Sequence, residues 1–401
     1  MKKTATAIAA FSLALSAIAL PTVQINSVVQ RWPWNNKVDI NYTVGNVETL
    51  ANGGYYRVVF TATIPGRAEP IVIDGSSDVI AKAVAGTHTV TWTPPDGVFA
   101  TGCTMNVDLY ESTGDYMIVD LDTGNYAFED LRATQAESNV RYNIDRNKGE
   151  RLVLRKVPKT SASAYPDGYP TGNSTAYPTV NTETNWTTTV DYFIGIFELT
   201  AAQYDRLMSG AASESYKPKG SVKWQTLRGV GASASSTGEV TANATGSGVF
   251  QRLSAKTGLY FDMPTELMWE IACRAGEKKA YPWGADDTTD LGTYAWYSGN
   301  SGNSTQPVGG KAANNWGLFD MLGNVMEMCR DGKSQANLAE SSSVFTPAAN
   351  PSGNYERRIR GGSYRSAESN VNPSSRGTVN HQPSSFSATA EQGCRAALYI
   401  K

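Results

Sequence analysis

Few residues of this 401-residue chain could make or break bonds. The two histidines are His88 and His381, and the four cysteines are Cys103, Cys273, Cys329 and Cys394. Two imidazoles cannot build a three-histidine metal centre, and the cysteines include no Cys-x-x-Cys pair of the kind that holds zinc. In an oxidising compartment we expect one or two long-range disulfides, although the spacing does not determine their pairing.

One short stretch has the residue types of a site. The sequence GGSYRSAESNV, residues 361–371, combines two glycines with a serine and a tyrosine, but no obvious general base or metal ligand follows it. A Ser-His-Asp hydrolase would need His381 as its base, and that histidine lies in a serine-rich segment without a nucleophile-elbow motif. We therefore do not expect hydrolase chemistry.

The charge of the chain argues against two classes of partner. The formal net charge is -2, and only 18% of the residues are charged. Because no basic cluster reverses this balance, nothing draws the chain to nucleic acid or to an anionic membrane surface.

The first residues have the pattern of a secretory signal peptide. Met1-Lys2-Lys3 precede an apolar, alanine-rich run over residues 5–20, and Ala17-Ile18-Ala19 has the small-x-small pattern of a cleavage site. We expect residues 1–19 to be removed and the protein to be secreted, periplasmic or at the cell surface. No later segment is apolar over the length of a transmembrane helix, so no membrane span is expected.

Alternating apolar and polar residues predict strands over residues 22–112. The alternation is clear at 56–64, 88–92 and 105–109, and glycine- and proline-containing turn sequences separate these runs. A region of this size with this pattern predicts an Ig-like β-sandwich. We expect His88, in one of these strands, to be a packed or edge imidazole rather than a ligand.

Residues 116–401 are rich in Gly, Ser, Asn and Trp and contain two predicted helices. Thr200 and Gln203 form a capping box at the start of the first helix. Thr265 caps the second helix, over residues 266–275. Both helices are expected to support the core rather than to form a site.

Several motifs follow one another in this second region. They are Tyr-Phe-Ile-Gly-Ile-Phe-Glu-Leu-Thr at 192–200, Met-Pro-Thr-Glu-Leu-Met-Trp-Glu at 263–270, Tyr-Pro-Trp-Gly at 281–284, the run from Asn315 to Glu327, Arg-Gly-Gly-Ser-Tyr at 360–364 and Gly-Cys-Arg at 393–395. In this order they resemble the formylglycine-generating enzyme family, also called the sulfatase-modifying factor family. The resemblance implies an α+β, loop-rich domain over residues 116–401, with a variant of the C-type lectin fold.

Enzymes of this family oxidise a cysteine on an unfolded sulfatase chain, using molecular oxygen and a copper ion held by two cysteines. The resemblance places those cysteines at Ser366 and Val371. A serine oxygen is a hard donor that stays protonated, and valine has no donor atom, so we expect no copper. Ser363 of the motif is retained, but we assign no catalytic residue. The iron-dependent sulfoxide synthases of the same family need three histidines, which the chain lacks.

The family also wraps a structural calcium ion in the loop that is Gly-Asn-Val-Met-Glu here, at 323–327. The implied ligands are the carbonyl groups of Leu322, Gly323 and Val325 and the carboxylate of Glu327. Hydrogen bonds from Asn324 and Glu327 to neighbouring loops would explain the same residues, and both interpretations are open.

Two cysteines near these motifs are assigned structural roles. Cys329 follows the 323–327 loop, and Cys394 stands where the family usually has phenylalanine. They form either a disulfide or two buried thiols.

Two classes of function follow from the resemblance. The first is a catalytically silent binding or accessory module for a glycan, peptide or protein ligand, and the second is a formylglycine-type oxidase with an atypical site. For the first, the expected ligand-binding surface consists of Ser363, Tyr364, Arg365, Ser366, Asn370, Asn372 and Arg376.

Overall fold

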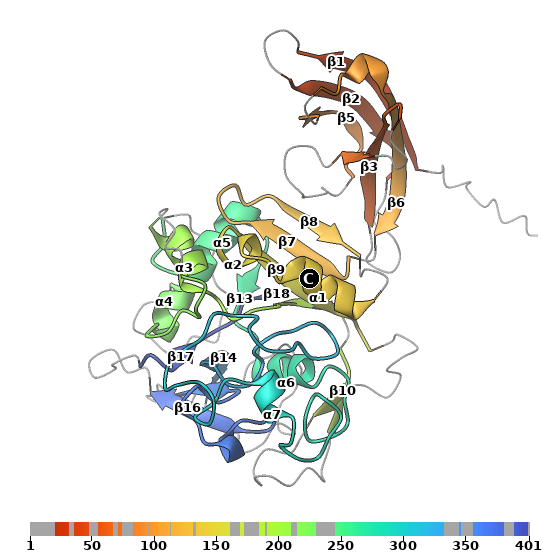
Figure 1. The fold of residues 1–401 in the computed structure, drawn as a ribbon. Helices are drawn as coiled ribbons and strands as arrows, with labels where there is room; N and C mark the ends of the chain where they lie inside the picture. The colour runs from red at the N-terminus through yellow and green to blue at the C-terminus, as the bar shows by residue number, and fades with distance from the viewer. Residues whose placement is uncertain are drawn as a thin grey trace, which may run out of the picture. The chain divides into compact units, whose positions relative to one another are not determined.

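The computed structural model divides into two compact units, Met1–Ser112 and Thr113–Lys401, which are considered separately (Figure 1). It describes residues 21–31, 36–47, 55–66, 71–73, 83–94, 97–112, 114–130, 134–160, 169–171, 184–188, 191–209, 215–229, 245–332, 345, 356–380 and 389–399. The predicted signal peptide at 1–19 lies outside these residues.

The first unit is built from antiparallel strands. They are β1 (Thr22–Gln30), β2 (Val38–Gly45), β3 (Tyr55–Thr63), β4 (Ile71–Ile73), β5 (Gly86–Trp92) and β6 (Thr104–Ser112), with the short 3-10 helix η1 (Ala100–Gly102) before β6. One sheet has the order β1-β2-β5 and the other the order β4-β3-β6. The strands predicted from the alternating pattern are confirmed as β3, β5 and β6.

The alternation of apolar and polar residues along the strands explains the core of this first unit. Val38 and Ile40 of β2 and Trp92 of β5 pack in one cluster with Phe60 and Ala62 of β3. The Nε2 atom of His88 lies 2.8 Å from the carbonyl oxygen of Val84, and its ring lies 5.4 Å from that of Tyr42. This histidine is therefore a packed strand residue, as predicted.

The second unit contains a central six-stranded sheet and two smaller sheets. The six-stranded sheet has the order β13-β18-β12-β9-β7-β8, the four-stranded sheet the order β16-β15-β14-β17, and β10 pairs with β11. The strands are β7 (Tyr116–Asp120), β8 (Tyr126–Glu129), β9 (Arg151–Val157), β10 (Tyr169–Thr171), β11 (Thr184–Trp186), β12 (Tyr192–Gly195), β13 (Phe261–Asp262), β14 (Met326–Gly332), β15 (Glu356–Arg360), β16 (Arg376–Asn380), β17 (Gln392–Gly393) and β18 (Ala397–Tyr399).

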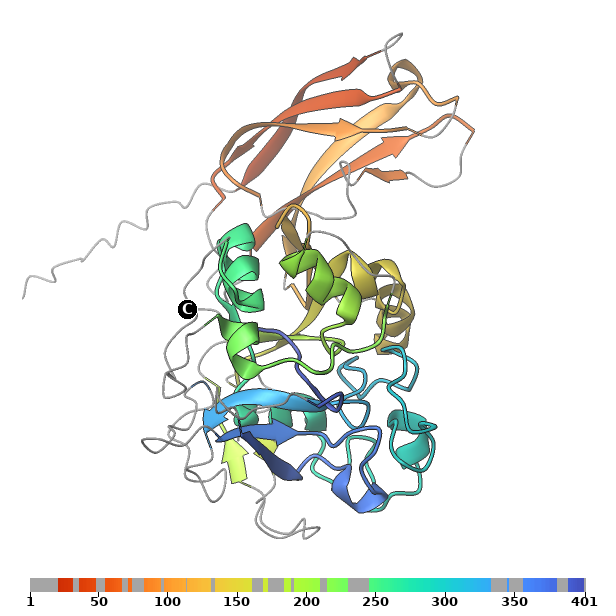
Figure 2. The same ribbon diagram turned by 90° about the vertical axis from the view of Figure 1, so that its left-hand side faces the viewer.

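The second unit also contains helices. They are α1 (Gln135–Tyr142), α2 (Arg146–Gly149), α3 (Ala201–Met208), α4 (Trp224–Arg228), α5 (Val249–Thr257), α6 (Glu266–Arg274) and α7 (Leu291–Tyr294), with the 3-10 helix η3 (Glu368–Asn370). Helices α3 and α5 lie side by side in Figures 1 and 2. The capping box of Thr200 and Gln203 is confirmed at α3, and the Thr265 cap is confirmed at α6.

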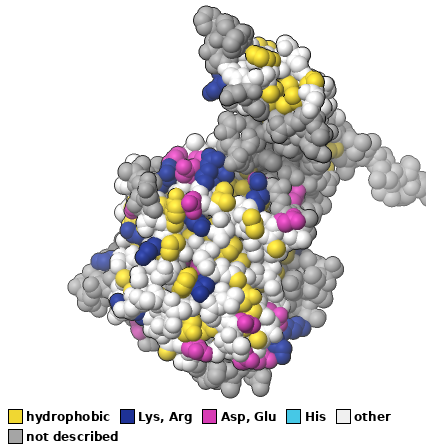
Figure 3. Space-filling view, in the orientation of Figure 1, with side chains coloured by type: hydrophobic (Ala, Val, Ile, Leu, Met, Phe, Trp, Pro, Cys, Tyr) yellow, Lys and Arg dark blue, Asp and Glu magenta, His cyan; other side chains and the backbone are white. Residues whose placement is uncertain are grey.

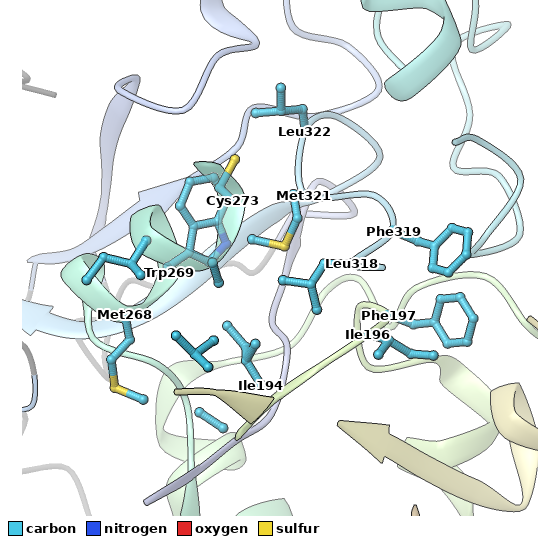
Figure 4. Packing of buried hydrophobic residues seen from close by; sticks show 14 of the residues in the cluster. Ile194, Ile196, Phe197, Met268, Trp269, Cys273, Leu318, Phe319, Met321 and Leu322 are labelled. Atoms are coloured by element: carbon cyan, nitrogen blue, oxygen red, sulfur yellow. The ribbon is translucent and has the colours of Figure 1, made fainter. Parts of the chain in front are cut away.

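The central sheet separates two hydrophobic clusters because successive side chains of a strand point to opposite faces. Ile118, Val153 and Ile194 belong to the first cluster, which includes the buried side of α6 and the segment 318–322 (Figure 4). Met117 and Phe193, each next to a residue of the first cluster, belong to the second cluster, with residues of α3, α4 and α5. Every residue of α6 is buried, so this helix supports the core, as predicted.

The four-stranded sheet brings three distant motifs together. Glu327 of β14 pairs with Arg360 of the antiparallel strand β15 and with Gly393 of the parallel strand β17. The 323–327 loop, the turn after Arg360 and the Gly-Cys-Arg motif therefore lie next to one another. This arrangement creates the candidate site.

Candidate functional site

Two glycines turn the chain immediately after β15. Gly361 and Gly362 have φ angles of +86° and +75°, a region that residues with a Cβ atom rarely adopt. A Cβ atom on Gly361 would lie 2.9 Å from the carbonyl oxygen of Met321. The glycines therefore allow the turn to pack directly on the 318–322 segment.

The two positions implied for copper-binding cysteines are brought together at this turn. A Cβ atom on Gly362 would lie 3.1 Å from Cγ2 of Val371 and 3.4 Å from Oγ of Ser366. Val371 is fully buried and packs in the first hydrophobic cluster. The two side chains thus face one small volume, to which they bring a hydroxyl and a methyl group but no thiol.

Ser366 belongs to a network of hydrogen bonds. Its Oγ accepts a hydrogen bond from the backbone nitrogen of Ser363 at 2.9 Å and lies 3.3 Å from Oγ of Ser363. Ser363 Oγ donates to Oε2 of Glu391 at 2.6 Å, and Arg365 forms an ion pair with the same carboxylate at 3.5 Å. The sequence did not single out Glu391, because nothing local indicates that a residue beside the Gly-Cys-Arg motif reaches the serines.

Only part of the predicted ligand-binding surface is exposed in the structure. Arg365 and Asn370 are exposed and Ser366 is half-buried. Ser363, Tyr364 and Asn372 are buried, with exposed fractions of 0%, 3% and 7%.

Tyr364 and Arg376 have tertiary partners in place of solvent. The backbone of Tyr364 bonds to the carbonyl of Asn324 and to the hydroxyl of Ser301. Arg376 donates to both carboxylate oxygens of Glu266 from a side chain that is 4% exposed. Tyr364 and Arg376 therefore support the predicted ligand-binding surface from within the protein.

No reactive thiol lies in the described site. Cys273, Cys329 and Cys394 are free and buried, and burial raises the pKa of each thiol, so they are not thiolates at neutral pH. Cys329 packs in the first hydrophobic cluster and Cys394 in the second. The two side chains thus pack in different cores, so the predicted disulfide is not formed, and the alternative of two buried thiols describes the structure.

A buried carboxylate that the sequence did not assign holds the 323–327 loop. Glu198 accepts hydrogen bonds from the backbone nitrogen of Val325 at 2.9 Å and from Nδ2 of Asn324 at 2.7 Å. Burial raises the pKa of Glu198 well above its ordinary value, and the charges of Asp320 and Glu327 act in the same direction. Glu198 belongs to the 192–200 motif, but its partners lie more than a hundred residues away, so its role could not be predicted locally.

The implied calcium ligands do not fit the ion in this arrangement. Glu327 would supply the only charged ligand, yet its carboxylate accepts two hydrogen bonds from Arg395 and one from Trp269. Asn324 and Glu327 both hydrogen-bond to neighbouring segments, which is the alternative that the sequence left open. Within the ranges described above, no group of three or more His, Cys, Asp or Glu side chains is placed to hold a metal ion.

His381 lies outside the described residues. Among those that are described, no helix has the length and apolar character needed to cross a membrane. Acidic and basic side chains are interspersed over the face of the second unit in Figure 3.

The sequence of the second unit matches a known protein family. A family model for the sulfatase-modifying factor enzyme 1-like domain matches residues 170–399, which is more than half of the chain. The chain belongs to the sulfatase-modifying factor family.

Curated relatives include formylglycine-generating enzymes. The enzyme of Thermomonospora curvata is 34% identical over 122 residues, which cover 27% of this chain and 40% of that protein. The enzyme of Bos taurus is 33% identical over 113 residues, covering 25% and 29%. The chain thus spans less than half the length of these relatives.

Two solved structures are also similar. Treponema denticola variable protein 1 has a TM-score of 0.47 and 19% identity, covering 62% of this chain and 96% of that one. PvdO from Pseudomonas aeruginosa has a TM-score of 0.47 and 18% identity, covering 64% and 97%.

Proposed function

We propose that the second unit is a catalytically silent binding or accessory module in an exported protein. The observation that carries this proposal is the pair Ser366 and Val371, whose side chains converge over Gly362 without a thiol. Cu(I) requires soft ligands, and a hydroxyl and a methyl group provide none. We also propose that this unit is a variant of the C-type lectin fold and that the first unit is an Ig-like sandwich.

The exposed part of the turn supports ligand recognition. Arg365 is 51% exposed, stacks over the ring of Tyr364 and donates to Oδ1 of Asn303 at 2.9 Å. Asn303, Glu368 and Asn370 are also exposed. Guanidinium, amide and carboxylate groups on one surface suit hydrogen bonding to a glycan, a peptide or a protein.

Ion pairs beneath this surface hold it in place. Arg376 binds Glu266, Arg360 binds Glu270, and Arg274 donates to the hydroxyl of Ser374. Glu266, Glu270 and Arg274 all belong to α6, so the segment 360–376 is fastened to a buried helix at several points. A surface ordered before binding loses less conformational entropy when a ligand binds.

The binding proposal is tested with the purified full chain on glycan and peptide arrays, beside a double variant Arg365→Ala with Asn370→Ala. We expect a ligand that the wild type retains and the variant loses. Glu150→Gln, which alters an exposed ion pair with Arg146, is the control and should bind as the wild type does. If the wild type retains nothing at millimolar sensitivity, the binding proposal fails.

The alternative is a formylglycine-type oxidase, which the names of the curated relatives favour. Oxygen uptake is measured with copper and a Cys-x-Pro-x-Arg peptide, and we expect none from the wild type. Turnover by the wild type would establish the alternative instead.

The variant Ser366→Cys with Val371→Cys tests whether the frame of the site survives. Because both positions face Gly362, we expect the double variant to bind about one Cu(I) per chain, whereas each single variant offers only one thiol. Failure of the double variant to bind would show that the two positions are not placed as the structure describes.

A further inference from the structure

The loop at 323–327 ends at Glu327, whose carboxylate pairs with Arg395 of the same chain. Arg395 is fully buried, and its guanidinium faces Glu327, which is 1% exposed. Nη2 of Arg395 donates to Oε1 of Glu327 at 2.6 Å, and Nε donates to Oε2 at 2.7 Å. Trp269 adds a third donor to Oε2 at 2.7 Å. The carboxylate therefore has donors on both oxygens.

Backbone carbonyl groups surround the rest of this guanidinium. Nη1 of Arg395 donates to the carbonyl oxygen of Gly195 at 2.9 Å. Nη2 donates to the carbonyl oxygens of Phe319 and Asp320 at 3.0 and 3.2 Å. One carboxylate and three carbonyl groups form the kind of hard oxygen environment that a calcium ion selects.

The polar groups of Asn324, within the loop, bind neighbouring segments of the chain. The backbone nitrogen of Asn324 donates to the carbonyl of Trp296, and its carbonyl accepts from the backbone nitrogen of Tyr364. Its Oδ1 atom accepts from the backbone nitrogen of Gln306, while Nδ2 donates to Glu198 and to the carbonyl of Gln306. The loop conformation is thus specified by hydrogen bonds within the chain.

We propose that the guanidinium of Arg395 is the permanent cation of this loop and that the second unit folds without a divalent metal. A calcium ion on Glu327 would lie next to the guanidinium of Arg395, which is buried and cannot move into solvent. The two positive charges would repel each other strongly, because the protein interior screens charges poorly. The five hydrogen bonds of Arg395 replace metal ligation and connect β12, the 319–320 segment and β14.

The first test uses the wild-type full chain. Metal content is measured after gel filtration in buffer without chelator, and the unfolding midpoint Tm is measured in millimolar EGTA, CaCl2 and MgCl2. We expect less than about 0.1 calcium per chain and Tm values within about 1 °C of each other, since an ion that does not bind the folded state cannot stabilise it. About one calcium per chain, with a Tm several degrees lower in EGTA, would overturn the proposal.

The variant Glu327→Gln, compared with the control Glu129→Gln, tests whether Glu327 is a partner of Arg395 or a calcium ligand. Glu327→Gln keeps an oxygen acceptor and removes the charge, so we expect the same decrease of Tm in EGTA and in CaCl2. Had calcium been bound, the decrease would appear only in CaCl2. Glu129→Gln, which removes the charge of another Arg-paired carboxylate, is the matched control and should leave the metal response unchanged. If Glu327→Gln does not fold, the wild-type measurements decide the question alone.

Discussion

Arg395 and Arg357 are both fully buried in the second unit, yet their surroundings are opposite. Arg395 makes five hydrogen bonds to a carboxylate and three carbonyl groups. None of the three side-chain nitrogens of Arg357 has a hydrogen-bond partner among the described residues. The guanidinium of Arg357 instead lies 4.3 Å from the centre of the Trp224 ring, which Arg228 also contacts at 4.7 Å.

The difference is visible in the electrostatics of the two residues. Burial, reinforced by the charge of Arg228, lowers the pKa of Arg357 to about 10. Burial also acts to lower the pKa of Arg395, but the charge and hydrogen bonds of Glu327, together with the charges of Glu198 and Asp320, outweigh burial and raise this pKa. A buried guanidinium therefore organises the fold only where oxygen acceptors surround it, because an unpaired buried charge costs free energy of desolvation.

The largest effect is expected from Arg395→Met. The substitution keeps roughly the volume of the side chain, but it leaves three carbonyl groups without the donor and Glu327 without its counter-charge, with Trp269 as its remaining donor. We therefore expect a loss of about 3–5 kcal/mol in the free energy of unfolding. Urea denaturation measures it. A loss below about 1 kcal/mol would mean that the five hydrogen bonds do not stabilise the fold.

A somewhat smaller effect is expected from Glu266→Gln. Burial alone would raise the pKa of Glu266, but the hydrogen bonds from Arg376 and the charges of Arg360 and Arg358 outweigh it and lower the pKa. The variant removes the charge that Arg376 binds and leaves Arg360 paired with Glu270 alone, so we expect a loss of about 3 kcal/mol at neutral pH.

The pH dependence gives a separate check on Glu266. A carboxyl group with a lowered folded-state pKa contributes stability above its unfolded pKa, near 4.5, and loses it as the pH falls through the folded value. The wild type should therefore lose stability below about pH 4.5, and Glu266→Gln should lose less over the same range. Parallel curves for the two proteins would contradict the assignment.

The substitution Arg357→Met is expected to increase the free energy of unfolding rather than decrease it. A thioether chain can pack against Trp224 without the cost of a buried unpaired charge, so we expect a gain of about 2 kcal/mol in the free energy of unfolding. A loss of stability would show that the stacking of Arg357 on Trp224 outweighs its desolvation.

The smallest effect is expected from Arg365→Ala. Its ion pair with Glu391 is half-exposed, and such pairs contribute about 0.5 kcal/mol or less. The free energy of unfolding should stay within that margin while ligand retention on the arrays is lost. A large loss of stability would show that Arg365 supports the fold rather than the surface.

These contrasts also show what could be predicted from the sequence. Helices α3 and α6 could be predicted because a capping residue and its N3 partner are close in the chain. The lack of a thiol at Ser366 and Val371 follows from the residue types alone, whereas the assignment of these two positions to copper comes from the family resemblance. Arg395 and Arg357 could not be told apart, since both are single arginines whose environments come from distant segments.

The candidate surface illustrates the same limit. Tyr364 and Arg376 have the residue types of a ligand-binding loop, and only their partners Asn324, Ser301 and Glu266 reveal that they are buried. Glu391 and Glu198 act across the fold, and no local pattern marks them. Sequence motifs thus indicate where the candidate surface lies, and tertiary contacts determine which of its side chains are accessible.

The position of β18 has a consequence for biosynthesis. This strand, Ala397–Tyr399, comes later in the chain than every other strand of the six-stranded sheet, yet it lies between β13 and β12. A nascent chain that has not reached residue 397 leaves both neighbouring strands without their partner. Completion of the sheet must therefore wait for nearly the whole second unit to be translated, and a chain truncated before β18 should stay incompletely folded.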